Sequence, residues 1–200
     1  YKRQVLLFTI DDLAGTVKGL NLLEIYIKFI NTYNEYIGIG VGWFTTLMVV
    51  VVFVNVLFRY IGGAGFLQLQ DFSWYLFGVV FMIGAAYTLK HDRHVRVDIF
   101  YVNYSPRRKV WTNLLGTIFF LIPFCLLGIY VSWGFFQQSF TVQETSPDAG
   151  GLAGRYLAKI MIPTGFGLIL LQGMALMFTS LLQLQGKWAI EEPETGEAAD

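Results

Sequence analysis

Residues 37–57 read IGIGVGWFTTLMVVVVFVNVL, a run without a charged side chain. A helix needs about 20 mostly apolar residues to cross the roughly 30 Å hydrocarbon core of a bilayer, and this run reaches that length. Three further runs approach it, at 72–89, 113–133 and 161–182. A soluble globule can bury one such run, but four leave too little polar surface to cover it. The sequence therefore predicts an all-α membrane protein with four transmembrane helices.

The composition of the whole chain agrees with a membrane protein. Of its 200 residues, 55% are hydrophobic and 14% are charged, and 14 Lys and Arg balance 14 Asp and Glu. Because there is no basic excess, nucleic acid is not expected as a partner. Cys125 is the single cysteine of the sequence. One cysteine excludes an intrachain disulfide and any zinc or iron–sulfur site built from several cysteines.

None of the four runs contains Asp, Glu, Lys, Arg or His. Pumps and many coupled carriers place such groups inside the membrane, so this chain is not expected to act as a carrier by itself. We interpret the polar residues Gln172, Asn55 and Thr117 as helix–helix hydrogen-bonding groups rather than substrate ligands. His91 and His94 lie among basic residues that repel a cation, so no metal, haem or other cofactor and no enzymatic activity is expected.

Basic residues near the predicted spans are unevenly distributed between the two sides. Nine lie on the side of the second connection: Lys18, Lys28, Lys90, Arg93, Arg96, Arg107, Arg108, Lys109 and Lys187. Three lie on the other side: Arg59, Arg155 and Lys159. Because the cytoplasmic side of a membrane protein carries the excess of Lys and Arg, both termini are predicted to be cytoplasmic.

The residues before the first span form two segments. Over 17–35, polar side chains recur every three or four residues and apolar ones fill the opposite face, which predicts an amphipathic helix. This helix is expected either to lie along the cytoplasmic interface or to pack against a partner subunit, and the pattern favours neither. Residues 1–16 are uninformative. The four-helix domain is expected at 36–188, and the acidic segment 189–200 is expected to be disordered.

A series of short motifs follows in order along the chain. They are RY at 59–60, LQDFSWYLF at 69–77, GAAYTLKH at 84–91, HVRVD at 94–98, SPR at 105–107, ETSP at 144–147 and GG at 150–151. In the order and spacing of these motifs, and in its four predicted spans, the chain resembles the small membrane subunit of tripartite ATP-independent periplasmic (TRAP) transporters. The resemblance covers roughly residues 35–186.

This resemblance implies a function and partners. In that family a periplasmic substrate-binding protein delivers an organic acid to a large membrane subunit, which imports it with sodium. The small subunit is implied to be a four-helix scaffold in the bacterial inner membrane, in contact with the large subunit and with membrane lipids. The segment 144–151 is similar to a branch associated with 2-oxo acids and related monocarboxylates. The alternative is a membrane anchor subunit of a respiratory enzyme, which would need haem-ligating histidines within its spans.

Two groups of residues are candidates for contacts with these partners. The first is expected at a subunit or lipid interface and comprises Arg59, Asp71, Trp74, His94, Arg96 and Asp98. Within it, Arg59 and Asp71 flank the first external connection and are placed to pair. The second is expected to contact the periplasmic binding protein and comprises Glu144, Asp148, Arg155 and Lys159. The alternatives are a solvated charged loop for the residues at 94–98 and a simple linker for those at 144–159.

Overall fold

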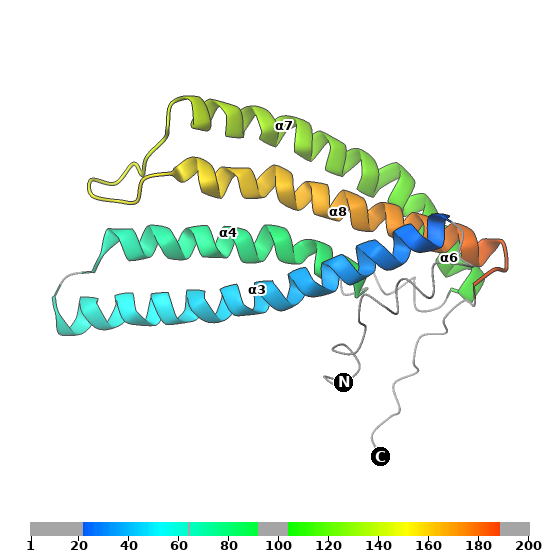
Figure 1. Ribbon diagram of the computed structural model, residues 1–200, viewed down its shortest axis with the longest axis horizontal. Helices are drawn as coiled ribbons and strands as arrows, with labels where there is room; N and C mark the ends of the chain where they lie inside the picture. Colours follow the sequence, from blue (N-terminus) through cyan, green and yellow to red (C-terminus); the bar gives the residue numbers. More distant parts are fainter. Residues whose placement is uncertain (1–21, 64, 92–103, 189–200) are drawn as a thin grey trace, which may run out of the picture.

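The structure is a computed structural model that describes residues 22–63, 65–91 and 104–188. Its helices are α3 (Leu22–Ile61), α4 (Leu67–Lys90), α6 (Pro106–Gly116), the π-helix η2 (Thr117–Leu121), α7 (Ile122–Thr141) and α8 (Arg155–Leu184) (Figure 1). Four helical stretches are long and apolar enough to cross a membrane, namely α3, α4, the continuous α6–η2–α7 stretch and α8. The prediction of an all-α protein with four transmembrane helices is confirmed. The predicted segments 1–16 and 189–200 lie outside the described residues.

The first spanning helix is longer than the sequence analysis predicts. α3 contains 40 residues, which at about 1.5 Å per residue is roughly twice the thickness of the hydrocarbon core. The separate interfacial helix expected over 17–35 is not seen, because residues 22–35 continue directly into the spanning part of α3; residues 17–21 are outside the described part of the chain. The reason is packing within the chain: Ile27, Ile30 and Asn34 are buried, and the Tyr26 hydroxyl donates to the Leu171 carbonyl oxygen of α8 at 3.1 Å.

The third stretch changes its hydrogen-bonding pattern next to a proline. Pro123 has no backbone N–H and cannot donate to the carbonyl four residues earlier. Immediately before it, η2 is wound more widely, and the N–H of Ile122 donates to the carbonyl oxygen of Thr117, five residues back. A single π turn of this kind absorbs a local break in the α-helical ladder. The stretch thus continues across the membrane from the polar α6 into the apolar α7.

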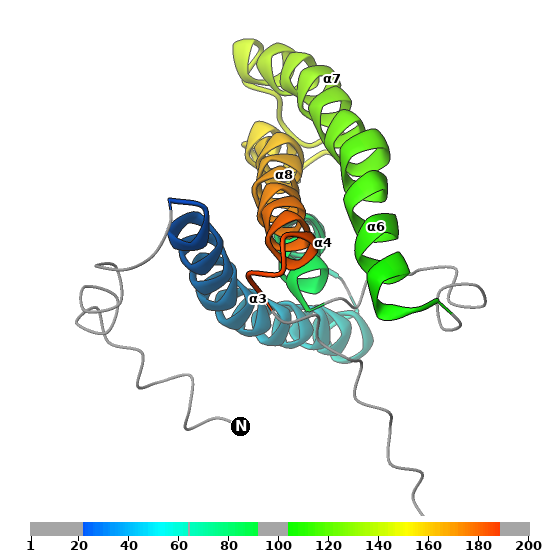
Figure 2. The same ribbon diagram turned by 90° about the vertical axis from the view of Figure 1, so that its right-hand side faces the viewer.

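α8 lies at the centre of the arrangement, where it contacts α3, α4, α6, η2 and α7. α3 and α4 pack against each other on one side of α8, and α7 packs on the other (Figure 2). The close approach of α4 and α8 requires Gly165, since a Cβ atom there would lie 2.7 Å from the backbone oxygen of Met82. Small residues that allow such close approach are the usual basis of helix packing in membranes. The four stretches therefore pack side by side in a bundle with α8 at its centre.

The outer surface of the bundle is apolar between the two ends of its helices. The connections between α3 and α4 and between α7 and α8 lie at one end, and the start of α3 and the end of α8 lie at the other (Figure 1). Between the two ends, large apolar side chains such as Trp43, Phe53 and Tyr130 are exposed on the outside of the helices. An apolar surface of this extent marks contact with lipid or with another protein in the membrane. The ion pairs among the described residues join side chains that lie outside the four predicted spans.

Candidate functional site

Glu144 is the centre of a polar cluster between α7 and α8. The hydroxyl of Ser139, near the end of α7, donates to Glu144 Oε2 at 2.6 Å. The ammonium group of Lys159, in the second turn of α8, binds the same oxygen, and Arg155 Nε lies 3.7 Å from Oε1. The Arg155 N–H also donates to the Glu144 carbonyl oxygen at 2.9 Å. Three of the four residues expected to contact a binding protein are thus brought together, and they bind one another.

The ion pair gives Glu144 a shifted titration. The ammonium group of Lys159, followed by the hydroxyl of Ser139, holds the pKa of Glu144 below its usual range. A carboxyl group whose pKa is lower in the folded protein stabilises it above the unfolded pKa, about 4.3. This contribution is lost as the pH falls through the lower folded value.

We therefore expect Glu144→Gln to lower the melting temperature of the detergent-solubilised protein by a few degrees at pH 7. The difference from the wild type should narrow below about pH 4 and disappear once Glu144 is protonated in the folded protein. Thermal unfolding followed by circular dichroism between pH 3 and 8 measures both. A difference in melting temperature that stays constant across this pH range would show that the charge of the Glu144 carboxylate contributes nothing to stability.

The segment 142–154, which connects α7 and α8, is anchored to a third helix. Asp71, in the second turn of α4, accepts a hydrogen bond from the backbone N–H of Leu152 through Oδ2 at 2.9 Å. Within the segment, Thr145 and Ala153 form an isolated antiparallel bridge, and the Ser146 N–H donates to the Leu152 carbonyl oxygen at 3.1 Å. The connection is therefore folded onto the ends of α4, α7 and α8.

The expected pairing of Arg59 with Asp71 is wrong. Across the described residues, no ion pair joins the two side chains; Asp71 accepts the Leu152 N–H instead. Arg59 is an exposed residue in the last turn of α3, and its guanidinium lies beside Gly65, where an added Cβ would meet Arg59 Nε at 3.2 Å. The two residues flank one connection, but the packing of α4 against the α7–α8 connection determines the partner of Asp71.

The other candidate interface residues differ in what the structure says of them. Trp74 is 64% exposed and meets the Phe77 ring edge to face, with ring centroids 6.2 Å apart. An exposed indole near the end of a spanning helix is typical of a lipid headgroup contact. His94, Arg96 and Asp98 lie outside the described residues, so their role stays a prediction.

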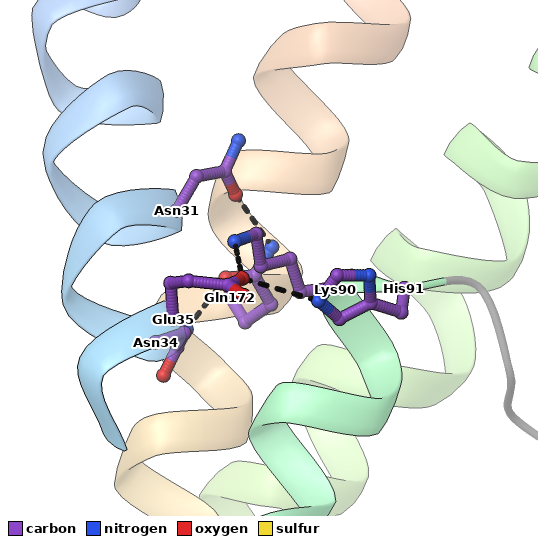
Figure 3. A network of polar contacts seen from close by, with 6 residues as sticks. All are labelled: Asn31, Asn34, Glu35, Lys90, His91 and Gln172. Atoms are coloured by element: carbon purple, nitrogen blue, oxygen red, sulfur yellow. Dashed lines mark hydrogen bonds and ion pairs between the residues drawn. The ribbon is translucent and has the colours of Figure 1, made fainter. Parts of the chain in front are cut away.

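A second polar cluster joins α3, α4 and α8 at the level where α4 ends (Figure 3). Gln172 accepts a hydrogen bond from Asn34 Nδ2 through Oε1 at 2.6 Å and donates through Nε2 to Asn31 Oδ1 at 3.0 Å. The carboxylate of Glu35 binds the Lys90 ammonium and lies 3.2 Å from His91 Nε2. Gln172 thus makes helix–helix hydrogen bonds, as expected.

The link from Glu35 to the end of α4 escapes the sequence analysis, although a carboxylate just before one span and a Lys-His pair just after the next could have indicated it. Asn55, expected to bond to another helix, instead accepts the Phe66 N–H through Oδ1 at 3.0 Å and ties α3 to the residue before α4. Among residues 22–63, 65–91 and 104–188, no group of three or more His, Cys, Asp and Glu side chains could hold a metal ion.

The fold and the two clusters define a class of protein. It is a small multi-pass membrane protein whose polar side chains connect its own helices and whose spans present apolar surface outward. The profile of the family "Tripartite ATP-independent periplasmic transporters, DctQ component" matches residues 48–183. The chain belongs to this family, and it is accordingly a TRAP transporter small permease subunit of the inner membrane and not an enzyme.

A relative and the solved structures complete the comparison. The chain is similar to the "C4-dicarboxylate TRAP transporter small permease protein DctQ" of Vibrio cholerae serotype O1, with 23% identity over 114 residues. The match covers 57% of this chain and 47% of the relative, so it spans about half the relative's length. No solved structure matches the chain.

Proposed function

We propose that this chain is the auxiliary scaffold subunit of a sodium-coupled, binding-protein-dependent secondary transporter that imports organic acids. One observation carries the scaffold role: the predicted spans contain no Asp, Glu, Lys, Arg or His. Ionisable groups inside the membrane are the usual sign of a transport path, and a scaffold does not need them. Sodium-driven uptake by proteoliposomes that contain this chain alone separates a scaffold from a carrier.

Carboxylates are the proposed substrate class. The printed name of the Vibrio cholerae relative refers to C4-dicarboxylates, which supports a dicarboxylate. The similarity of the segment 144–151 to another branch favours 2-oxo acids and related monocarboxylates. Both are organic anions, and the small subunit holds no group within its spans that would distinguish them. Uptake by the assembled transporter with each labelled acid decides between the two.

The proposed partners are a large membrane subunit, a periplasmic substrate-binding protein and membrane lipids. The exposed apolar faces of α3, α4 and α7, with side chains such as Val50, Phe81 and Phe124, suit the large subunit and lipid acyl chains. Both termini are proposed to be cytoplasmic, on the strength of the excess of Lys and Arg on that side. The start of α3 and the end of α8 lie at the same end of the bundle, as two termini on one side of the membrane require (Figure 1). The alternative of a respiratory anchor subunit is not favoured.

The α7–α8 connection is the proposed docking site for the binding protein. In the proposed orientation it faces the periplasm, and loops on a rigid scaffold carry recognition disproportionately often. Of the four candidate contacts, Glu144, Arg155 and Lys159 bind one another. Asp148 is exposed at the tip of the connection, which makes it the charge most available to a partner.

We therefore expect Asp148→Lys to raise the binding-protein concentration needed for half-maximal uptake several-fold, with the maximal rate unchanged. The reason is that a charge at the rim of an interface mainly changes the association rate of the two proteins. Gln68→Lys is the matched control, since Gln68 is exposed at the start of α4, which lies at the same end of the bundle as the α7–α8 connection. Uptake by proteoliposomes titrated with binding protein measures both. Identical titrations for Asp148→Lys and the wild type would contradict a docking role for this charge.

A further inference from the structure

Gly151 occupies a position where a side chain would collide with Asp71 and Ser146. A Cβ atom at this site would lie 2.5 Å from Asp71 Oδ2 and 2.5 Å from Ser146 Cβ. Such distances are far below van der Waals contact, so any side chain here would force the Asp71 carboxylate or Ser146 to move. The glycine therefore lets the backbone at 151–152 approach the Asp71 carboxylate closely.

Asp71 uses that approach to hold the connection from outside. Its Oδ2 accepts the Leu152 N–H at 2.9 Å, and this bond joins positions 81 residues apart in the sequence. Leu152 is held from the other side as well, because its carbonyl oxygen accepts the Ser146 N–H at 3.1 Å. A hydrogen bond to an ionised carboxylate is about twice as strong as a neutral one. One side chain of α4 is thus bound to both arms of the connection, directly to one and through Leu152 to the other.

The residues that this arrangement presents are exposed. Between Ser146 and Gly151 lie Pro147, Asp148, Ala149 and Gly150, and all four are exposed. The turn is closed by the Gly151 N–H, which donates to the Asp148 carbonyl oxygen at 3.0 Å. Asp148 is the one charged residue among these four. A partner that recognises this tip must therefore offer a basic or hydrogen-bond-donating group opposite a single carboxylate.

We infer that Asp71 is a positioning residue for docking: together with Gly151 it holds the tip at 147–150 in the conformation that the periplasmic binding protein recognises, without touching that protein. This inference rests on the proposed function. Association must otherwise order a loose loop, and fixing the backbone of a single residue changes an equilibrium constant on the order of tenfold. A tip that is ordered in advance removes this penalty from the binding step.

Two variants of the assembled transporter test the inference. Asp71→Ala removes the acceptor, while Asp71→Asn keeps an oxygen that can accept the Leu152 N–H. Gln70→Ala is the control, since Gln70 is the exposed neighbour of Asp71 on α4. Amide hydrogen exchange over 145–153 reports the order of the tip, and uptake titrated with the binding protein reports docking.

For Asp71→Ala we expect faster exchange over 145–153 and an increase of about tenfold in the half-maximal binding-protein concentration, with the maximal uptake rate unchanged. Gln70→Ala should resemble the wild type in both measurements, and Asp71→Asn, which keeps only a neutral acceptor, should fall between the wild type and Asp71→Ala. Unchanged exchange in Asp71→Ala would overturn the positioning role and leave the proposed docking site standing. Faster exchange with an unchanged titration would overturn both. A loss of maximal rate at an unchanged half-maximal concentration would overturn the inference, because it marks damage to the transporter rather than to docking.

Discussion

Replacement of Gln172 by alanine is expected to lower the free energy of unfolding by about 2 to 3 kcal/mol. The variant loses the hydrogen bonds that Gln172 makes to Asn31 and Asn34 on α3, and interhelix bonds of this kind contribute about 0.6 kcal/mol each. The truncation also leaves a void between α3 and α8, and the buried amide of Asn34 loses its hydrogen-bond partner. Together these add about 1 to 2 kcal/mol. Asn34 is 1% exposed, so water does not readily replace the lost partner.

The measurement is denaturant-induced unfolding of the purified protein in bicelles, with Gln137→Ala as the matched control. Gln137 is also a glutamine on a spanning stretch, but it is exposed near the end of α7, and its truncation should change the free energy of unfolding by less than about 0.5 kcal/mol. A double variant of Asn34 and Gln172 should lose less than the sum of the single effects, because the two share a bond. Equal stability of Gln172→Ala and Gln137→Ala would show that the cluster in Figure 3 does not hold α3 to α8.

The number and approximate position of the spanning helices follow from elementary constraints. The run at 37–57 has the length that the hydrocarbon core requires and no charge to make its burial costly. The weakest of the four runs, 72–89, belongs to α4, which begins at Leu67 and has 24 residues. Membrane thickness thus acts on each helix separately, and this is why single-sequence reasoning succeeds here.

The N-terminal part of α3 shows where that reasoning ends. The polar repeat over 17–35 predicts a helix, and residues 22–35 are helical. Periodicity identifies side chains that share a face, but it does not identify what covers the face. Asn31 and Asn34 bond to Gln172 on α8, from which Asn34 is separated by 138 residues in the chain. Only the tertiary packing of α3 against α8 brings these amides together.

In the candidate site, too, sequence indicates the contacts between neighbouring residues and misses those made by tertiary packing. Glu144, Arg155 and Lys159 were identifiable as one charged segment because they are close in sequence, and the structure brings them together. Asp71 was assigned to Arg59, its neighbour across a short connection, whereas its partner is the Leu152 backbone. A backbone N–H carries no sequence signature, so neither charge nor spacing could have indicated this bond. The need for Gly151 beside it is likewise visible only in three dimensions.

Proteoliposomes that contain this chain alone are expected to show no sodium-driven uptake of a C4-dicarboxylate. A coupled carrier must dehydrate its ion and its substrate anion inside the membrane. It uses buried charges or the ends of unwound helices to replace the lost water. The predicted spans contain no Asp, Glu, Lys, Arg or His, and the polar side chains of Gln172 and Asn55 are bound within the chain. Uptake should appear when the large subunit and the binding protein are added, at a rate far above that of empty vesicles.

The most direct test of the scaffold role is therefore the initial rate of labelled C4-dicarboxylate and 2-oxo acid uptake under an inward sodium gradient. It is compared between vesicles with this chain alone, vesicles with the full complex and empty vesicles. The account predicts that the chain alone matches empty vesicles, while the full complex takes up one of the acids and loses this uptake when the sodium gradient is collapsed. Sodium-dependent uptake by the chain alone would contradict it.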